Sequence, residues 1–345
     1  MSSIDGGSGG VAVLDEPPAP GPAPEDDGRR KRLLILLAMI GGLLVLLGAI
    51  FAWYLITHKP LTELPVLGND SMPTYRYSIY GVERPLGVAV SADGDRVYVT
   101  QSEGARTVLE FSHEGKLLAT LQPPKDGKSH LPVNVAVNPT DGSVAVSDTL
   151  ARAVYIYSAD GTYRRTVKPV GLTGTFLPLG LAFDGSGDLY VSETGGTTHR
   201  VLVLDQFDQV HRTIVPTDSP FSFPFAIAVD KAGHVFVTDS DNGRLVEFGS
   251  DGKEIALVNR GIGEGDLGLP RGVATDSGDR VYVVDTTNQT VHAYRVGDGA
   301  LSFIGGFGDE GIADGLFEYP NGIAIDGRSD VYITDRENGR VQVWS

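Results

Sequence analysis

Six prolines recur along this 345-residue chain at a nearly constant interval. They are Pro85, Pro132, Pro178, Pro224, Pro270 and Pro320, and successive members lie 47, 46, 46, 46 and 50 residues apart. Each proline opens a short apolar run, and two runs rich in valine, isoleucine and tyrosine follow it, separated by turn residues. A unit of about 45 residues with about four strands is typical of a β-propeller blade. The chain is therefore predicted to form an all-β, six-bladed propeller.

The last repeat shows the unit most clearly. It reads Pro-Asn-Gly-Ile-Ala-Ile-Asp at 320–326, Val-Tyr-Ile-Thr-Asp at 331–335 and Asn-Gly-Arg-Val-Gln-Val-Trp at 338–344. These motifs resemble the NHL repeat, and the resemblance extends from residue 75 to residue 345. It implies a propeller of the NHL type, a fold that hosts binding proteins and a few enzymes.

The two ends of this region are expected to meet. The sixth repeat reaches Ser345 without a fourth strand, whereas Tyr75–Tyr80 alternates like a strand and precedes Pro85 at the distance where other repeats carry their last strand. We therefore expect Tyr75–Tyr80 to complete the last blade, because closure of the ring removes sheet edges that would otherwise be exposed. This assigns residues 75–345 to the propeller.

Three segments of different composition precede the propeller. Residues 1–28 are rich in Gly, Pro, Ala and acidic residues, and are predicted to be a disordered tail because they bury too little apolar surface. Residues 29–58 join the basic cluster Arg29–Arg32 to the uncharged stretch Leu33–Ile56. As a helix that stretch spans about 36 Å, which is enough to cross a hydrocarbon core of about 30 Å. Residues 59–74 contain several prolines and are expected to be a spacer.

The flanks of Leu33–Ile56 indicate how it is oriented. The basic cluster lies on its N-terminal side, and Trp53 and Tyr54 lie near its far end, as in membrane helices. We expect a single-pass cell-membrane protein with a cytoplasmic N-terminus and an extracytoplasmic propeller. A cleaved signal peptide is the alternative, but its apolar core usually has only about 7–15 residues.

Charge and cysteine content exclude several classes of function. The chain has 44 Asp and Glu against 28 Lys and Arg, and its formal net charge is −16. Nucleic acids are bound largely through Lys and Arg, so no nucleic-acid partner is predicted. Because cysteine is absent, disulfides, thiolate metal sites and cysteine nucleophiles are excluded.

The residues that directly follow the six prolines are expected to face the propeller axis, and we call this set the axial mouth. Its members are Leu86, Val133, Leu179, Phe225, Arg271 and Asn321. Apolar walls with a few polar groups suit a protein or small-molecule ligand. Arg271 is expected either to orient an anionic or carbonyl-bearing ligand or to pair with an acid such as Asp285. His130, His199 and Asn134, which replaces a glycine of the repeat, are placed at the same end.

Two sets of side chains are candidates for metal binding. Carboxylates at the ends of the second strands are expected to ring the axis, where they either gather a cation or accept hydrogen bonds from nearby turns. They are Asp148, Glu193, Asp239, Asp285 and Asp335, with Gln101 in the sixth position. A catalytic zinc needs three protein ligands, and only His130 and His199 lie at this end, because His113 and His234 lie in turns at the other. No cofactor is expected, with calcium or zinc as the alternatives.

These features favour a non-enzymatic binding or scaffold module, and no catalytic residue is assigned. The alternative is an exported hydrolase or lyase with its site at the axial mouth. The resemblance to related propellers implies carboxylates and asparagines for a gluconolactonase-like enzyme, and histidine-bound zinc for an amidating-lyase-like enzyme. No Gly-x-Ser-x-Gly nucleophile motif is present.

Overall fold

The computed structural model describes residues 27–57, 71–297 and 299–345. The chain separates into two units, Met1–Gly68 and Asn69–Ser345. The tail expected at 1–28 lies almost wholly outside the described residues, as does most of the spacer at 59–74, so both stay predictions.

The first unit contains one helix, α1 (Asp27–Thr57), among its described residues. The window Lys31–Ala49 has a mean hydropathy of 2.4 and is long and apolar enough to cross a membrane, and none of it is buried. A helix with exposed apolar side chains needs an apolar environment outside the protein, which a membrane provides. By length and composition, α1 fits either a membrane span or a signal sequence.

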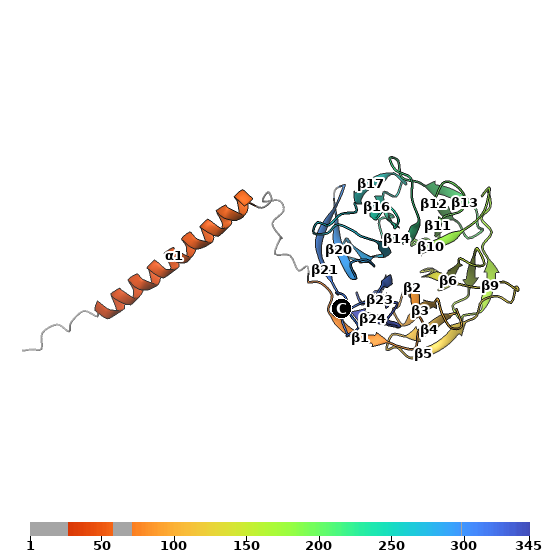
Figure 1. Ribbon diagram of the computed structural model, residues 1–345, viewed down its shortest axis with the longest axis horizontal. Coiled ribbons are helices and arrows are strands. Elements are labelled where there is room, and N and C mark those ends of the chain that lie inside the picture. The colour runs from red at the N-terminus through yellow and green to blue at the C-terminus, as the bar shows by residue number, and fades with distance from the viewer. Residues whose placement is uncertain (1–26, 58–70, 298) are drawn as a thin grey trace, which may run out of the picture. The chain divides into compact units, whose positions relative to one another are not determined.

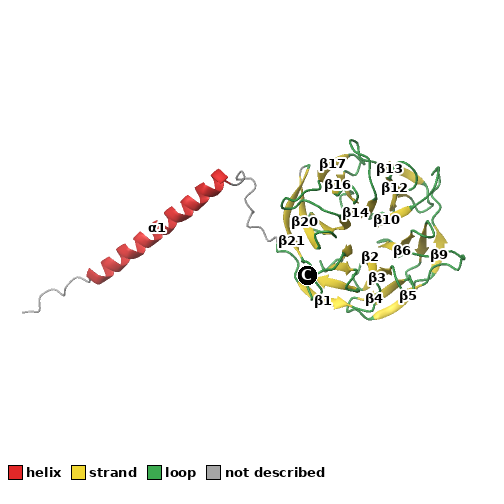
Figure 2. Ribbon diagram, viewed as in Figure 1, coloured by secondary structure: helices red, strands yellow, loops and turns green. Residues whose placement is uncertain are grey.

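The described part of the second unit forms six four-stranded antiparallel sheets around one axis (Figure 1, Figure 2). The innermost strands are β2 (Pro85–Val90), β6 (Pro132–Val137), β10 (Pro178–Phe183), β14 (Pro224–Val229), β18 (Pro270–Thr275) and β22 (Pro320–Ile325). The second strands are β3 (Arg96–Gln101), β7 (Val144–Asp148), β11 (Leu189–Glu193), β15 (Val235–Asp239), β19 (Arg280–Asp285) and β23 (Val331–Asp335). The third strands are β4 (Val108–Ser112), β8 (Ala153–Tyr157), β12 (Arg200–Leu204), β16 (Arg244–Phe248), β20 (Thr290–Gly297) and β24 (Arg340–Trp344). The outermost strands are β5 (Leu117–Leu121), β9 (Tyr163–Thr166), β13 (Val210–Ile214), β17 (Glu254–Val258), β21 (Ala300–Phe307) and β1 (Tyr75–Ile79). The six-bladed all-β prediction is confirmed.

The core lies between neighbouring blades. Every residue of β7, β8, β15 and β16 is buried, because both faces of these strands contact other side chains. Five of the six apolar clusters draw on two adjacent blades, as where Ala274 and Tyr282 pack with Ile323 and Val331. This arrangement explains the nearly continuous valine, isoleucine and tyrosine content of the second and third strands.

The ring is closed by β1, which pairs antiparallel with β24 as the outermost strand of the last blade (Figure 1). Tyr75 lies opposite Trp344, and Ile79, only 1% exposed, lies opposite Val341. Thr74 and Ser345 then exchange main-chain hydrogen bonds of 2.8 and 2.9 Å. The last blade therefore depends on residues from both ends of the second unit.

Candidate functional site

Each innermost strand has an irregular register directly after its proline. In β18, Pro270 pairs with Asp285, and the register shifts before the next pair, Val273 with Val283. The other five innermost strands show the same shift. A bulge of this kind redirects side chains. It accounts for how Leu86, Val133, Leu179 and Phe225, which come from four blades, meet in one cluster.

The apolar members of the axial mouth form a floor. Val133, Leu179 and Phe225 are at most 7% exposed, and Leu86 packs against the same cluster together with Phe223. The sequence suggested apolar walls around a ligand. The structure instead packs these side chains on one another, so a ligand at this end would lie on an apolar surface.

Arg271 lies over this floor. Its guanidinium carbon is 4.4 Å from the centre of the Phe225 ring and 5.7 Å from that of Phe223, which are cation–π distances. Its main-chain carbonyl accepts a hydrogen bond of 2.6 Å from Thr238 Oγ1 of the neighbouring blade. Burial lowers the pKa of Arg271, and Asp241 opposes this effect. An arginine nevertheless keeps its charge, so the floor carries a fixed cation.

Arg271 and Asp285 do not form the ion pair that was one of the two expectations. Asp285 accepts hydrogen bonds from the main-chain N–H groups of 268–269 at 2.6 and 3.1 Å, and from Asn288 Nδ2 at 2.9 Å. Among the described residues, the Arg271 guanidinium has no hydrogen bond or ion pair. On the adjacent innermost strand, Asn321 is 6% exposed and its Oδ1 also has no hydrogen-bond partner. Two polar groups of the axial mouth therefore have unused hydrogen-bonding capacity.

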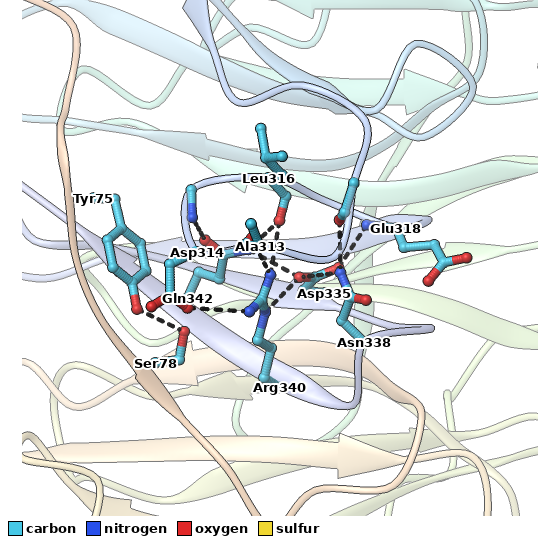
Figure 3. Close-up of polar contacts among 12 residues, drawn as sticks. Tyr75, Ser78, Ala313, Asp314, Leu316, Glu318, Asp335, Asn338, Arg340 and Gln342 are labelled. Carbon is cyan, nitrogen blue, oxygen red and sulfur yellow. Dashed lines mark hydrogen bonds and ion pairs between the residues drawn. The ribbon is translucent and has the colours of Figure 1, made fainter.

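The five ring carboxylates bind the chain's own loops. Asp335 accepts hydrogen bonds from the Glu318 main-chain N–H at 2.7 Å, Arg340 Nε at 2.7 Å and Gln342 Nε2 at 2.9 Å (Figure 3). Asp148, Glu193, Asp239 and Asp285 likewise accept from the loop that leads into the proline of their own blade, and Gln101 does so through its amide oxygen. The structure thus has the local hydrogen bonds that were one of the two expectations for this ring.

The two histidines at this end are each held by separate partners. His130 Nδ1 lies 2.8 Å from Asp148 Oδ2, and its Nε2 lies 3.3 Å from Asp126 Oδ1. His199 Nδ1 accepts a hydrogen bond of 3.0 Å from the main-chain N–H of Phe223. Both imidazoles therefore fix loops, and they share no partner among the described residues.

Asn134 stands where four other innermost strands have glycine. A Cβ atom at Gly322 would lie 2.4 Å from the carbonyl oxygen of Leu86, and one at Gly180 would lie 2.6 Å from that of Phe225. Glycine thus permits close approach of adjacent innermost strands. Asn134 is half-buried, and its main-chain N–H donates to Ser147 Oγ at 3.1 Å.

Three further residues, which the sequence pattern did not indicate, shape the mouth. Phe223 has a φ of 60° and contacts the Arg271 guanidinium, and Arg336 lowers the pKa of Arg271 further. Thr238 fixes the Arg271 main chain, and a hydroxyl residue recurs at its position in four other second strands: Thr100, Ser147, Ser192 and Thr334. The sequence shows this recurrence, and three of those hydroxyls also donate to the carbonyl of the residue that follows the proline of the next innermost strand.

Comparison with known families identifies the repeated unit. Residues 221–248, 267–294 and 317–344 match the NHL repeat. The chain carries NHL repeats. The matched segments begin shortly before the prolines of the last three blades and end with their third strands, which confirms the resemblance of those repeats.

Two curated proteins are similar over parts of this chain. A probable peptidyl-alpha-hydroxyglycine alpha-amidating lyase of Caenorhabditis elegans is 27% identical over 146 residues, which cover 39% of this chain. Human NHL repeat-containing protein 3 is 24% identical over 243 residues, which cover 58% of this chain. The matches span 41% and 66% of the lengths of these relatives.

Solved structures share the fold at low sequence identity. A chain of a nidogen/laminin complex is 17% identical with a TM-score of 0.54, covering 66% of this chain and 80% of its own length. A catalytically inactive virginiamycin B lyase from Staphylococcus aureus, solved with quinupristin, is 16% identical with a TM-score of 0.53. That match covers 79% of this chain and 87% of the lyase.

Proposed function

We propose that this chain is a membrane-tethered NHL propeller that binds a protein or small-molecule ligand at the axial mouth. The observation that carries this proposal is Arg271, which lies over Phe225 without an acidic partner in the described chain. A cation–π contact contributes about 0.5–2 kcal/mol and leaves the N–H donors of the guanidinium free. A carboxylate of a ligand would form charge-assisted hydrogen bonds with those donors while its apolar part lies on the floor.

The similar proteins support ligand binding without fixing its class. One similar propeller occurs in a complex of nidogen with laminin, and another was solved with quinupristin. Similarity to an amidating lyase favours an enzyme as the second candidate. Against that candidate, His130 and His199 each have local partners of their own. Binding is therefore the function that the geometry supports best.

The ligand contact can be tested with Arg271→Ala. Using N-acetyl-phenylalanine and its amide as probes, we expect the wild-type protein to bind the carboxylate more tightly than the amide. Arg271→Ala should weaken carboxylate binding by about 1–3 kcal/mol and abolish that preference. Arg212→Ala is the matched control, because Arg212 lies 5.6 Å from the Tyr190 ring outside the mouth. Equal affinities of wild type and Arg271→Ala for the carboxylate would remove Arg271 from the site.

For membrane topology we propose a cytoplasmic N-terminus, because Arg29–Arg32 precede the apolar part of α1. Protease added to spheroplasts should digest the propeller and leave an epitope tag at residue 1 protected. A cytoplasmic enzyme serves as the control for membrane integrity. Digestion of the tag with a protected propeller would reverse the topology, and a propeller released into the medium would indicate a cleaved signal.

A further inference from the structure

A group of metal-ligating side chains lies at the other end of the propeller, at the closing seam, where the last blade meets the first. His113 follows β4 of the first blade, and Asp326 and Asp330 flank the turn between β22 and β23 of the last blade. One ligand atom of each lies within 4.8 Å of the others. Neither the axial mouth nor the ring carboxylates belong to this group.

The hydrogen bonds of Tyr332 fix the His113 ring. The Tyr332 hydroxyl lies 3.3 Å from Asp326 Oδ2 and 2.7 Å from His113 Nδ1. Because Nδ1 contacts this hydroxyl, Nε2 is the His113 ring nitrogen available to a metal ion.

His113 Nε2 lies 3.7 Å from Asp330 Oδ2, which is too long for a hydrogen bond. Two ligands at about 2.1 Å from one zinc ion lie about 3–4 Å apart. His113 Nε2 and Asp330 Oδ2 are therefore separated by a distance that suits two ligands of one metal ion.

We propose that His113, Asp326 and Asp330 bind a divalent transition-metal ion of the zinc class, with water completing the coordination. One imidazole and two carboxylates suit zinc better than calcium, which prefers oxygen ligands alone. Because the ligands come from both sides of the seam, the ion would link the first blade to the last. It would thereby stabilise the closure that β1 begins.

A charged group near the site affects its affinity for a metal ion. Arg328 lies beside Asp326, but its guanidinium is directed to the carbonyl of Gly94 and the carboxylate of Asp95. This positive charge opposes a metal ion. Its removal by Arg328→Gln should therefore tighten metal binding, whereas a purely structural role of the acids would not produce that gain.

The test uses the purified full-length protein in detergent, stripped of metal with a chelator and titrated with zinc chloride by calorimetry. We expect one zinc ion per chain and a melting temperature higher by about 5 °C at a zinc concentration of about 100 times Kd. His113→Asn and Asp330→Asn should each weaken binding more than tenfold and abolish the rise. Circular dichroism of each variant verifies the fold.

His211→Asn is the matched control, because His211 lies 2.9 Å from Asp188 but belongs to no group of three metal-ligating side chains among the described residues. It should bind zinc like the wild type, as should Arg271→Ala at the other end of the propeller. The proposal is overturned if zinc does not bind stoichiometrically, or if it binds His113→Asn and Asp330→Asn as tightly as wild type. Unchanged or weaker zinc binding by a folded Arg328→Gln also counts against it.

Discussion

A chain that begins at Gly81 is expected not to form the propeller, whereas a chain that begins at Asn69 keeps it. The shorter chain lacks β1 and so loses the pairing between β1 and β24. It also uncovers the core around Ile79, which packs with Val341 and Val343 in the cluster at the closing seam. A domain is stabilised by only about 5–15 kcal/mol, and the loss of a whole strand is of comparable size.

Thermal unfolding followed by circular dichroism distinguishes the two chains. The chain from Asn69 should melt cooperatively, and the chain from Gly81 should show no cooperative transition and should aggregate through its exposed β24 edge. A synthetic peptide of residues 69–80 should restore folding of the shorter chain by adding the missing strand. Equal cooperative melting of both chains would contradict a structural role for β1.

The blades could be predicted from the sequence because their signals are local. All six prolines begin innermost strands, as expected, since proline lacks an N–H donor and is tolerated at the first position of a strand. The closing strand could be anticipated for a similar reason, because Tyr75–Tyr80 alternates and precedes Pro85 at the repeat spacing.

The partner of Arg271 could not be predicted in this way. Its environment depends on the bulge after Pro270, on the positive φ of Phe223 and on a ring supplied by the neighbouring blade. None of these is encoded by residues next to Arg271. Asp285 was the acid expected to pair with Arg271, but loop N–H groups already donate hydrogen bonds to that carboxylate.

The metal-ligating group at the closing seam could not be predicted from the sequence for a different reason. His113 and Asp330 are far apart in the sequence, and the repeat pattern placed His113 only at the end opposite the axial mouth. They become neighbours because the ring closes and sets the last blade beside the first. Contacts created by closure follow from the number and tilt of all the blades, which no single motif specifies.

Replacement of a ring carboxylate is expected to produce the largest loss of stability from a single substitution. Asp335 is 0% exposed and lies 2.7 Å from Arg340 Nε, while Arg340 is only 4% exposed (Figure 3). Asp335→Ala leaves that buried cation without its nearest carboxylate and leaves the Glu318 N–H unsatisfied. Breaking one side of a buried pair in this way costs about 3–5 kcal/mol, so the melting temperature should fall by about 10 °C.

The control for this prediction is Asp251→Ala, which removes an exposed ion pair with Lys253 and should leave the stability nearly unchanged, because solvent screens such pairs. Urea unfolding of both variants, with and without chelator, tests whether the ring carboxylates gather a cation or accept hydrogen bonds from nearby loops. If Asp335 serves the loop and Arg340, its loss of stability is the same in both conditions. If Asp335→Ala lowers the free energy of unfolding only without chelator, the ring instead gathers a cation. If it lowers that free energy by less than about 1 kcal/mol, the buried pair is not a source of stability.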